Sequence, residues 1–298
     1  LDNSSFPRGF LFHENNEIKK IPLISSARKN EPVFGTKVQI DEIKKHLEKK
    51  LSNLIPEIQN WIPDQVENYN NKKNHEELIT YINFKLWQEL KVASKLITID
   101  QESIVNEILI EYIGKHHGID AILFNVGIRE KYLQIFDSCV GAHNNKKKSG
   151  THLFWYRGEK KREQMFIEND NLVTSSGIKT KLEKETVRDM LKEKKVYPCM
   201  ALTFIILCGF GGLRTDGGFC QINYLVDIMD RLKKLAENND VLGTIYSPNP
   251  SIFRGEFVLE NKYSKTPIDF ILENNPLFLN KIRDDSKNIS LENAIYGM

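Results

Sequence analysis

The chain has 298 residues, of which 40% are hydrophobic and 28% charged, enough for one large or two small domains with an ordinary core. Its 42 Lys and Arg nearly balance 40 Asp and Glu, so the composition provides no general attraction to nucleic acid or to an anionic membrane. The longest apolar run, 200–210, is far shorter than the roughly 18 residues of a membrane span. We therefore predict a cytoplasmic protein that has neither nucleic acid nor a membrane as its partner.

The chain begins with Leu1 rather than Met and shows no signal-peptide pattern, so we expect it to start inside a longer product. The spacing of its four cysteines matches neither a CxxC zinc pair nor the disulfide framework of a small secreted domain. We expect reduced, structural thiols in a cytoplasmic protein. The cysteines are Cys139, Cys199, Cys208 and Cys220.

The hydrophobic pattern divides the chain into three parts. Residues 1–36 are expected to form a strand and loop segment that joins the core, 37–117 a helical part, and 118–298 an α/β core. In the helical part, apolar residues recur at helical spacing, and Thr98 followed by Gln101 has the pattern of a capping box. The helices expected there span 37–55, 76–96 and 98–113.

The core begins with the short apolar run 119–126, which predicts a buried strand followed by a helix at 129–137, half of a βαβ unit. A polar loop at 144–150 precedes a hairpin formed by 152–157 and 164–167. The further elements expected are a helix at 183–194, a buried run at 200–207, a glycine-rich elbow at 209–218, a helix at 219–236, a strand at 241–246 and short helices near 268–273 and 291–296.

The glycine-rich elbow is the strongest candidate for a binding site. Its glycines, including Gly217 and Gly218, permit close backbone approach, and the first N–H groups of the following helix favour an anion. Arg214 and Asp216 lie within the elbow. A tight turn whose glycines serve only packing is the alternative. Neither dinucleotide-binding nor P-loop spacing is present, which excludes a Walker-type nucleotidase.

Other candidate ligand-binding residues lie close to predicted strands or to the elbow. Gln221 and Tyr224 project from one side of the helix after the elbow. The strand 151–157 has aromatic residues on both faces, which is typical either of a pocket wall or of plain sheet core. Its candidates are His152, Trp155 and Arg157.

Two further candidate positions follow apolar runs. Asn125 stands at the end of the predicted strand 119–126, and His13 with Glu14 follows the apolar residues 10–12, where open α/β sheets place polar ligand groups. The pair His116 and His117 does not suggest a metal site, because adjacent residues of a helix point about 100° apart. We therefore expect no metal, and no cofactor is assigned.

From residue 104 onward, the order of these segments resembles the core of bacillithiol synthase, the cysteine-adding enzyme. The similar segments are Gly118–Asn125, Arg129–Leu133, Leu153–Arg162, Glu183–Leu191 and Gly217–Leu225. The resemblance implies an α/β fold with a Rossmann-like core and a helical N-terminal part. It also implies a bacterial ligase or transferase of a biosynthetic pathway, which condenses or transfers an amino-acid-derived group onto an amine.

The expected partner is a small-molecule substrate with an anionic group, and assembly into a homo-oligomer is left open. The anion would be held by the start of the helix at Phe219 and by Arg214 or Arg157, while Gln221, Tyr224 and His152 would orient the substrate. The elbow of the family carries a carboxylate where this chain has the amide of Gln221. The alternative is therefore a non-catalytic scaffold or partner subunit that retains the fold.

Overall fold

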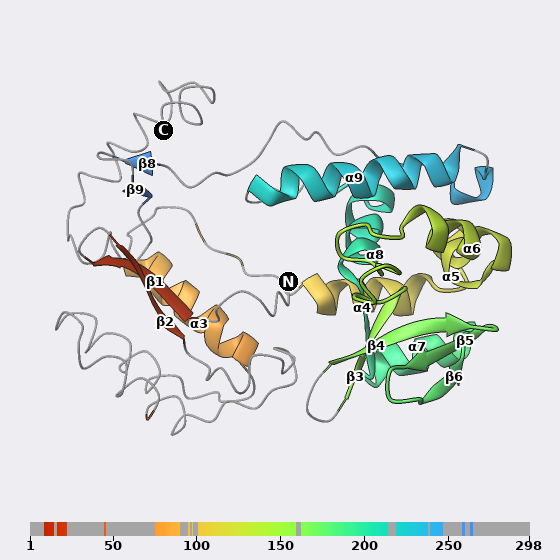
Figure 1. The fold of residues 1–298 in the computed structure, drawn as a ribbon, viewed down its shortest axis with the longest axis horizontal. Helices are drawn as coiled ribbons and strands as arrows, with labels where there is room; N and C mark the ends of the chain where they lie inside the picture. The colour runs from red at the N-terminus through yellow and green to blue at the C-terminus, as the bar shows by residue number, and fades with distance from the viewer. Residues whose placement is uncertain are drawn as a thin grey trace. The chain divides into compact units, whose positions relative to one another are not determined.

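The computed structural model separates the chain into two compact units (Figure 1). One unit is formed by 99–255 together with Leu1, and the other by 2–98 and 256–298. The residues that the structure describes are 9–14, 17–22, 45, 75–89, 95, 97, 101–158, 162–213, 219–237, 239–246, 258–259 and 263–264. The helices predicted at 37–55, 268–273 and 291–296 lie outside them, except for Lys45, which is helical.

The unit that contains the N-terminal region has two described hairpins and one long helix. Strand β1 (Gly9–Glu14) pairs antiparallel with β2 (Glu17–Pro22), β8 (Val258–Leu259) pairs with β9 (Tyr263–Ser264), and α3 spans His75–Glu89. Helix α3 agrees with the predicted helix 76–96 over the residues that are described there as helical, 76–89. His13 and Glu14 were expected after a strand. They are instead the last two residues of β1, in a two-stranded antiparallel hairpin.

The other unit contains one five-stranded sheet of order β6-β5-β4-β3-β7. Every neighbouring pair in it is antiparallel. The prediction of an α/β protein is therefore confirmed only as a mixture of helices and strands, and the Rossmann-like parallel sheet was wrong for the described residues. The strands are β3 (Phe154–Arg157), β4 (Arg162–Glu168), β5 (Asn171–Thr174), β6 (Lys179–Lys181) and β7 (Val196–Pro198).

Antiparallel pairing follows from the short connections between these strands. The predicted hairpin is confirmed, with Trp155 opposite Gln164, and β5 returns after the turn at Asn169 and Asp170, both of which have positive φ. Parallel neighbours would need a crossover of about a dozen residues or more, usually a helix. No such crossover joins consecutive strands from β3 to β6.

Helices enclose the core of this unit. They are α4 (Gln101–Tyr112), α5 (His117–Phe124), α6 (Val126–Ile135), α7 (Lys184–Lys192), α8 (Met200–Phe204) with a π-helical continuation at Ile205–Phe210, and α9 (Phe219–Ala236). Helices α4 and α7 pack against each other and against β7, while α9 packs on α6 and α8. The predicted helices at 129–137, 183–194 and 219–236 are thus confirmed.

The strand predicted at 119–126 is wrong, because that segment forms α5 and the start of α6. The run is continuously apolar since α5 is buried almost all round, and short buried helices and buried strands share this pattern. Two side chains cap the N-termini of these helices, His116 that of α5 and Asn125 that of α6. Nδ1 of His116 accepts from Ile119 N at 3.2 Å, and Oδ1 of Asn125 accepts from Ile128 N at 3.1 Å.

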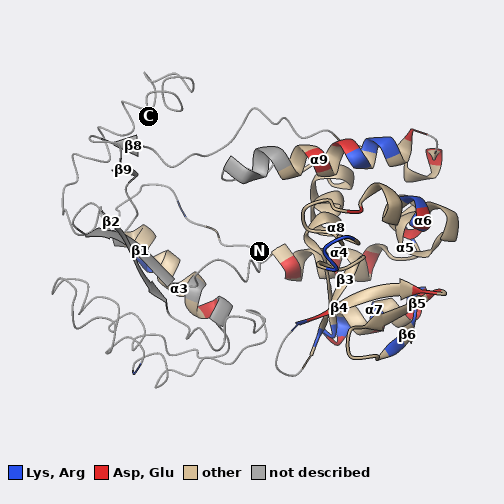
Figure 2. Cartoon of the chain, in the orientation of Figure 1, with Lys and Arg blue, Asp and Glu red and all other residues tan. Residues whose placement is uncertain are grey.

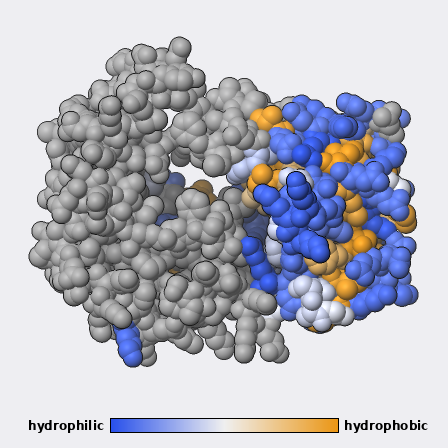
Figure 3. Space-filling model, viewed as in Figure 1, coloured by the Kyte–Doolittle hydropathy of each residue, from blue (hydrophilic) through white to orange (hydrophobic). Residues whose placement is uncertain are grey.

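The apolar run 200–207 is buried, as its composition predicts. Phe204, Ile205 and Cys208 are at most 1% exposed, and Figure 3 shows that hydrophilic residues cover much of the visible face of this unit, with apolar patches between them. The strand predicted at 241–246 is wrong, because Asp240–Leu242 forms a 3-10 turn and Gly243 has a φ of 69°.

Candidate functional site

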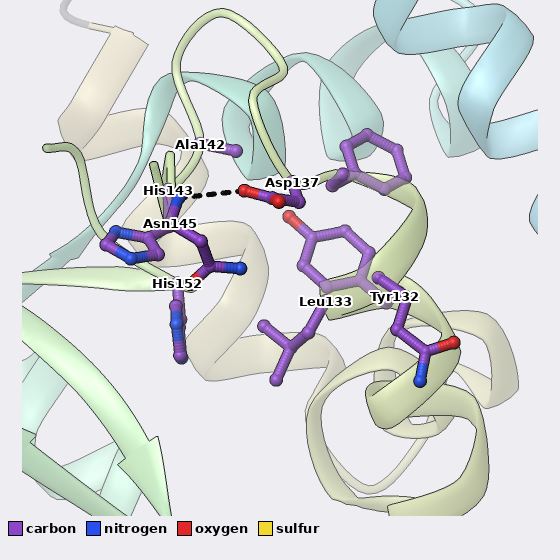
Figure 4. A pocket seen from close by; sticks show the side chains of 9 residues that line it. Tyr132, Leu133, Asp137, Ala142, His143, Asn145 and His152 are labelled. Carbon is purple, nitrogen blue, oxygen red and sulfur yellow. Dashed lines mark hydrogen bonds between the residues drawn. The ribbon is translucent and has the colours of Figure 1, made fainter. Parts of the chain in front are cut away.

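A cavity of about 330 Å³ lies between the end of α6, the loop that follows it and the start of the sheet. Its volume is within the range of small-molecule sites in proteins. Four of its side chains carry polar groups suited to chemistry: Tyr132, Asp137, His143 and His152 (Figure 4). The lining residues are Tyr132, Leu133, Gln134, Phe136, Asp137, Ala142, His143, Asn145 and His152.

Asp137 provides the negative charge of the cavity. It follows α6 directly, and Ser138 after it has a φ of 65°, which turns the chain away from the helix axis. The backbone N–H of Asn145 donates to Oδ1 of Asp137 across 2.9 Å, as drawn in Figure 4. This hydrogen bond lowers the pKa of Asp137 below its ordinary value, with a smaller contribution from His143. The carboxylate is therefore ionised near neutral pH.

His152 is held in one tautomer. Its Nδ1 accepts from the backbone N–H of Ile167 at 3.0 Å, so the ring proton lies on Nε2 in the neutral form. Burial, with a smaller contribution from His143, lowers the pKa of His152 to about 4. The neutral imidazole therefore prevails near pH 7, and Nε2 is a hydrogen-bond donor.

The two histidine rings pack together with one phenylalanine ring. The centroids of His143 and His152 are 4.9 Å apart with an interplanar angle of 72°, and Phe166 lies edge-on to both rings at 5.2 and 5.6 Å. Such edge-to-face contacts fix the orientation of the imidazoles.

Two polar atoms of the cavity lining have no hydrogen-bond partner. They are Nδ1 of His143 and the hydroxyl oxygen of Tyr132, and both are buried. Tyr132 is fully buried, and this burial, together with the thiols of Cys199 and Cys139, raises its pKa well above the ordinary value. Buried polar groups are nearly always paired, and an unpaired one costs about 1–3 kcal/mol. Two such groups therefore lie in residues that line this cavity, and the hydroxyl of Tyr132 is also close to the Cys199 thiol.

The loop 144–150 contributes Asn145 to the cavity lining. Asn144 and Ser149 form a β-bridge, with N to O distances of 2.8 and 3.3 Å, and Nε2 of Gln164 donates to the carbonyl of Gly150 at 2.7 Å. The predicted polar loop is thus a closed turn attached to β4. Its lysines, Lys146 to Lys148, are exposed.

Helix α9 holds the backbone on the other side of the cavity. Nη1 of Arg231 donates to the carbonyls of Ile135 and Asp137, the latter at 3.2 Å, and its Nε donates to Asp227 at 2.8 Å. A guanidinium at the carboxyl end of α6 satisfies carbonyls that the helix leaves unpaired. Arg231 therefore fixes the turn from which Asp137 enters the cavity.

Of the predicted site residues whose side chains the structure describes, one lines this cavity, namely His152. Trp155 and Arg157 lie on β3, where Arg162 covers the Trp155 ring at 4.3 Å. Tyr224 packs on Phe204 with centroids 5.7 Å apart. Asn125 caps α6 rather than ending a strand, so the pocket predicted at the end of that strand has no strand to build it.

The remaining predicted residues lie where their side chains are not described. Arg214, Asp216, Gly217 and Gly218 are outside the described residues, as are the side chains of Gln221, His13 and Glu14. The described elbow glycines are closely packed. A Cβ on Gly209 would lie 2.5 Å from Leu232, and one on Gly211 would lie 2.8 Å from the carbonyl oxygen of Leu207. These two glycines serve packing, which was the alternative for the elbow.

Sequence reasoning missed Tyr132, Asp137 and His143. Tyr132 follows the helical pattern of α6 and is indistinguishable from a core residue. Asp137, His143, Asn145 and His152 come within sixteen residues of each other, between a helix and a strand. That local gathering of groups able to exchange protons was the available signal.

Among the described residues, no three His, Cys, Asp or Glu side chains are arranged to hold a metal ion. Likewise, none of the helices within the described ranges combines the length and apolar character needed to cross a membrane. No protein-family model matches the chain, and no curated protein is similar to it.

Proposed function

We propose that the unit formed by 99–255 binds a small amine substrate in the cavity and belongs to a biosynthetic ligase or transferase. The observation that carries this proposal is the cavity wall itself. It combines an ionised carboxylate, two imidazoles and a buried phenol, and two of its buried polar atoms have no partner. These groups can bind a polar molecule and move a proton.

Asp137 is the group that selects an amine. The hydrogen bonds from Asn145 N and from the hydroxyl of Ser138 both reach Oδ1 of Asp137. Its Oδ2 is therefore the atom that we assign to a substrate ammonium group. A charge-assisted hydrogen bond of this kind is about twice as strong as a neutral one.

The two imidazoles have different roles in the proposed reaction. An amine attacks an acyl carbon only after losing a proton, and the imidazole of His143, which lines the cavity, is the acceptor that we assign to that proton. His152 presents its Nε2–H as a donor to the oxygen on which negative charge develops, because Ile167 occupies Nδ1. The amine nitrogen then forms the new C–N bond while the leaving group departs with the bonding electron pair.

The resemblance to bacillithiol synthase supports the same reaction class. Of the segments that carry it, the helix at 129–133, the hairpin and the helix after the elbow are present. The Rossmann-like sheet does not support this resemblance. A cytoplasmic location stays a prediction, as does anion binding by Arg214 or Arg157. A non-catalytic scaffold is the alternative, and it is favoured by the loss of the family's acidic group at Gln221.

Ligand titration followed by NMR tests the proposal. The side-chain resonances of His143 and His152 are recorded while ethylammonium chloride is added, and a dissociation constant in the millimolar range is expected for so small a ligand. Asp137→Asn should weaken binding by tenfold or more. Asp189→Asn, which removes an exposed carboxylate of α7 that pairs with Lys192 at 3.8 Å, is the matched control and should bind like the unmodified protein. Ring resonances that do not move would support the scaffold.

A further inference from the structure

We propose that the substrate of this cavity also carries an oxyanion, a phosphate or a carboxylate, and that Lys146, Lys147 and Lys148 bind it at the rim. This inference rests on the proposed function and specifies its substrate class. The ligand would be a zwitterion, with its ammonium group at Asp137 and its oxyanion at the lysines. Asn145 of the cavity wall belongs to the same closed turn as the lysines, and its backbone N–H binds Asp137, so this turn connects the two groups that would bind the ligand.

The lysines follow a cavity-lining residue in the chain. Asn145 lines the cavity and its N–H binds Asp137, and the three lysines follow it immediately in the chain. The backbone N–H of Lys147 donates to Oδ1 of Asn144 at 2.8 Å, which tightens the turn. The basic residues therefore begin one residue after the group that holds the carboxylate.

The backbone of the lysine turn is fixed while its side chains are free to reach a ligand. Nε2 of Gln164 donates to the carbonyls of Gly150 and Lys148, at 2.7 and 3.3 Å, and Lys148 itself has a φ of 47°. All three lysines are exposed. A fixed backbone lowers the entropy that binding has to overcome, which favours a site over an ordinary solvated loop.

The charges of the lysine turn lack internal compensation. Within the described part of the chain, none of the three lysines takes part in an ion pair, whereas lysines of other elements do, such as Lys184 with Asp120 at 2.6 Å. Figure 2 shows the loop between α6 and β3 as a basic segment. Three adjacent ammonium groups repel each other, and an oxyanion removes that repulsion because it attracts all three.

Because the cavity and its rim would carry opposite charges, they would orient a ligand that carries both charges. Asp137 disfavours an anion inside the cavity, and the lysines disfavour an ammonium group at the rim. A molecule with an amine at one end and an oxyanion at the other is therefore preferred over a simple amine or a simple anion. A nucleic acid, which offers phosphates but no aliphatic amine, uses only half of these groups.

The test compares two ligands on the same NMR readout, the rings of His143 and His152 at low ionic strength. Ethylamine has only the amine, and O-phosphoethanolamine has the amine and a phosphate. The unmodified protein should bind O-phosphoethanolamine at least tenfold more tightly. In the triple variant Lys146→Gln, Lys147→Gln and Lys148→Gln, the two ligands should bind within twofold of each other. β-Alanine, with a carboxylate in place of the phosphate, shows which oxyanion is preferred.

The control variant removes the same charge elsewhere. Lys179→Gln, Lys181→Gln and Lys192→Gln change exposed positions of β6 and α7 that do not line the cavity, and the tenfold preference should persist. Equal binding of both ligands to the unmodified protein would overturn this inference and leave the proposed function standing. Failure of both ligands to shift the rings would overturn the proposed function and this inference with it.

Two further measurements would show whether the anion binds at another place. If Arg214→Ala abolishes the preference while the lysine variant retains it, the oxyanion binds at the elbow and the inference is wrong. If a short RNA binds through the three lysines without moving the histidine rings, the turn is a nucleic-acid contact, which is also contrary to the proposal. Retention of the far-UV circular dichroism spectrum in every variant shows that the fold is intact.

Discussion

The Cα of Gly150 packs directly against the carbonyl group of Ala142 at the edge of the cavity. A Cβ at Gly150 would lie 2.0 Å from that carbonyl oxygen, closer than any real Cβ contact, and Gly150 has a φ of 79°. Because Ala142 lines the cavity, this contact sets the distance between the lysine turn and the cavity wall. Only glycine fits there.

Gly150→Ala should therefore open the turn. We expect a loss of about 2–4 kcal/mol in the free energy of unfolding, from the left-handed backbone and the clash together, together with loss of ethylammonium binding. Gly177→Ala is the control, since Gly177 has a similar φ of 91° and a Cβ there would meet nothing within 4 Å. It should cost only about 1 kcal/mol. Equal losses in urea denaturation of the two variants would show that the close contact has no effect.

Acidification should destabilise the protein through His152. Its pKa is about 4 in the folded chain against 6.5 when unperturbed, so between these values the unfolded chain binds a proton that the folded chain does not. The stability that comes from keeping His152 neutral in the folded chain is therefore fully present above about pH 6.5. It is lost as the pH falls to about 4. The expected loss is about 2–3 kcal/mol.

Urea denaturation from pH 4 to pH 7 measures this contribution. His152→Gln should weaken the dependence of the free energy of unfolding on pH in this interval. His117→Gln, at an exposed ring, should leave that dependence unchanged. If the free energy of unfolding of the His152 variant depends on pH as strongly as that of the unmodified protein, other groups cause the acid sensitivity.

Arg129 connects α6 to the sheet although it is only 4% exposed. Its guanidinium donates to the carbonyl of Leu123 at 3.0 Å and pairs with Asp170 in the turn before β5. Arg129→Ala should cost about 2–4 kcal/mol, because the buried carbonyl loses its donor and the long side chain leaves a cavity.

Asp170→Asn is the comparison for Arg129. Asp170 is 63% exposed, so this change should cost less than about 1 kcal/mol. Thermal unfolding of both variants shows which of the two substitutions costs more stability. A larger loss for Asp170→Asn would mean that the ion pair, and not the buried hydrogen bond, stabilises the connection.

The three described cysteines should resist labelling in the native protein. Cys139, Cys199 and Cys208 are buried and are not part of a disulfide, and burial raises the pKa of Cys139 to about 12 and that of Cys199 to about 11. In a Cys220→Ser background, a thiol reagent at pH 8 should react only after denaturant is added. Rapid modification of one equivalent in the native state would contradict this expectation.

Sequence patterns alone predicted the elements whose local signals are strong. The helices α7 and α9 and the hairpin of β3 and β4 were recognisable, because amphipathic spacing and a polar turn between two aromatic runs are local properties. The burial of 200–207 followed from composition. His152 was also found as a candidate.

Tertiary structure alone decided the rest. Whether 119–126 is strand or helix depended on the caps at His116 and Asn125 and on burial around α5, since a buried segment shows no periodicity in either state. The sheet became antiparallel because the connections between its strands are short. The cavity depended on side chains brought together by packing, with Tyr132 from a helix and His152 from the start of a sheet. Periodicity reports which face of an element is buried, but not which other element covers it, and for that reason the site emerged only from the folded chain.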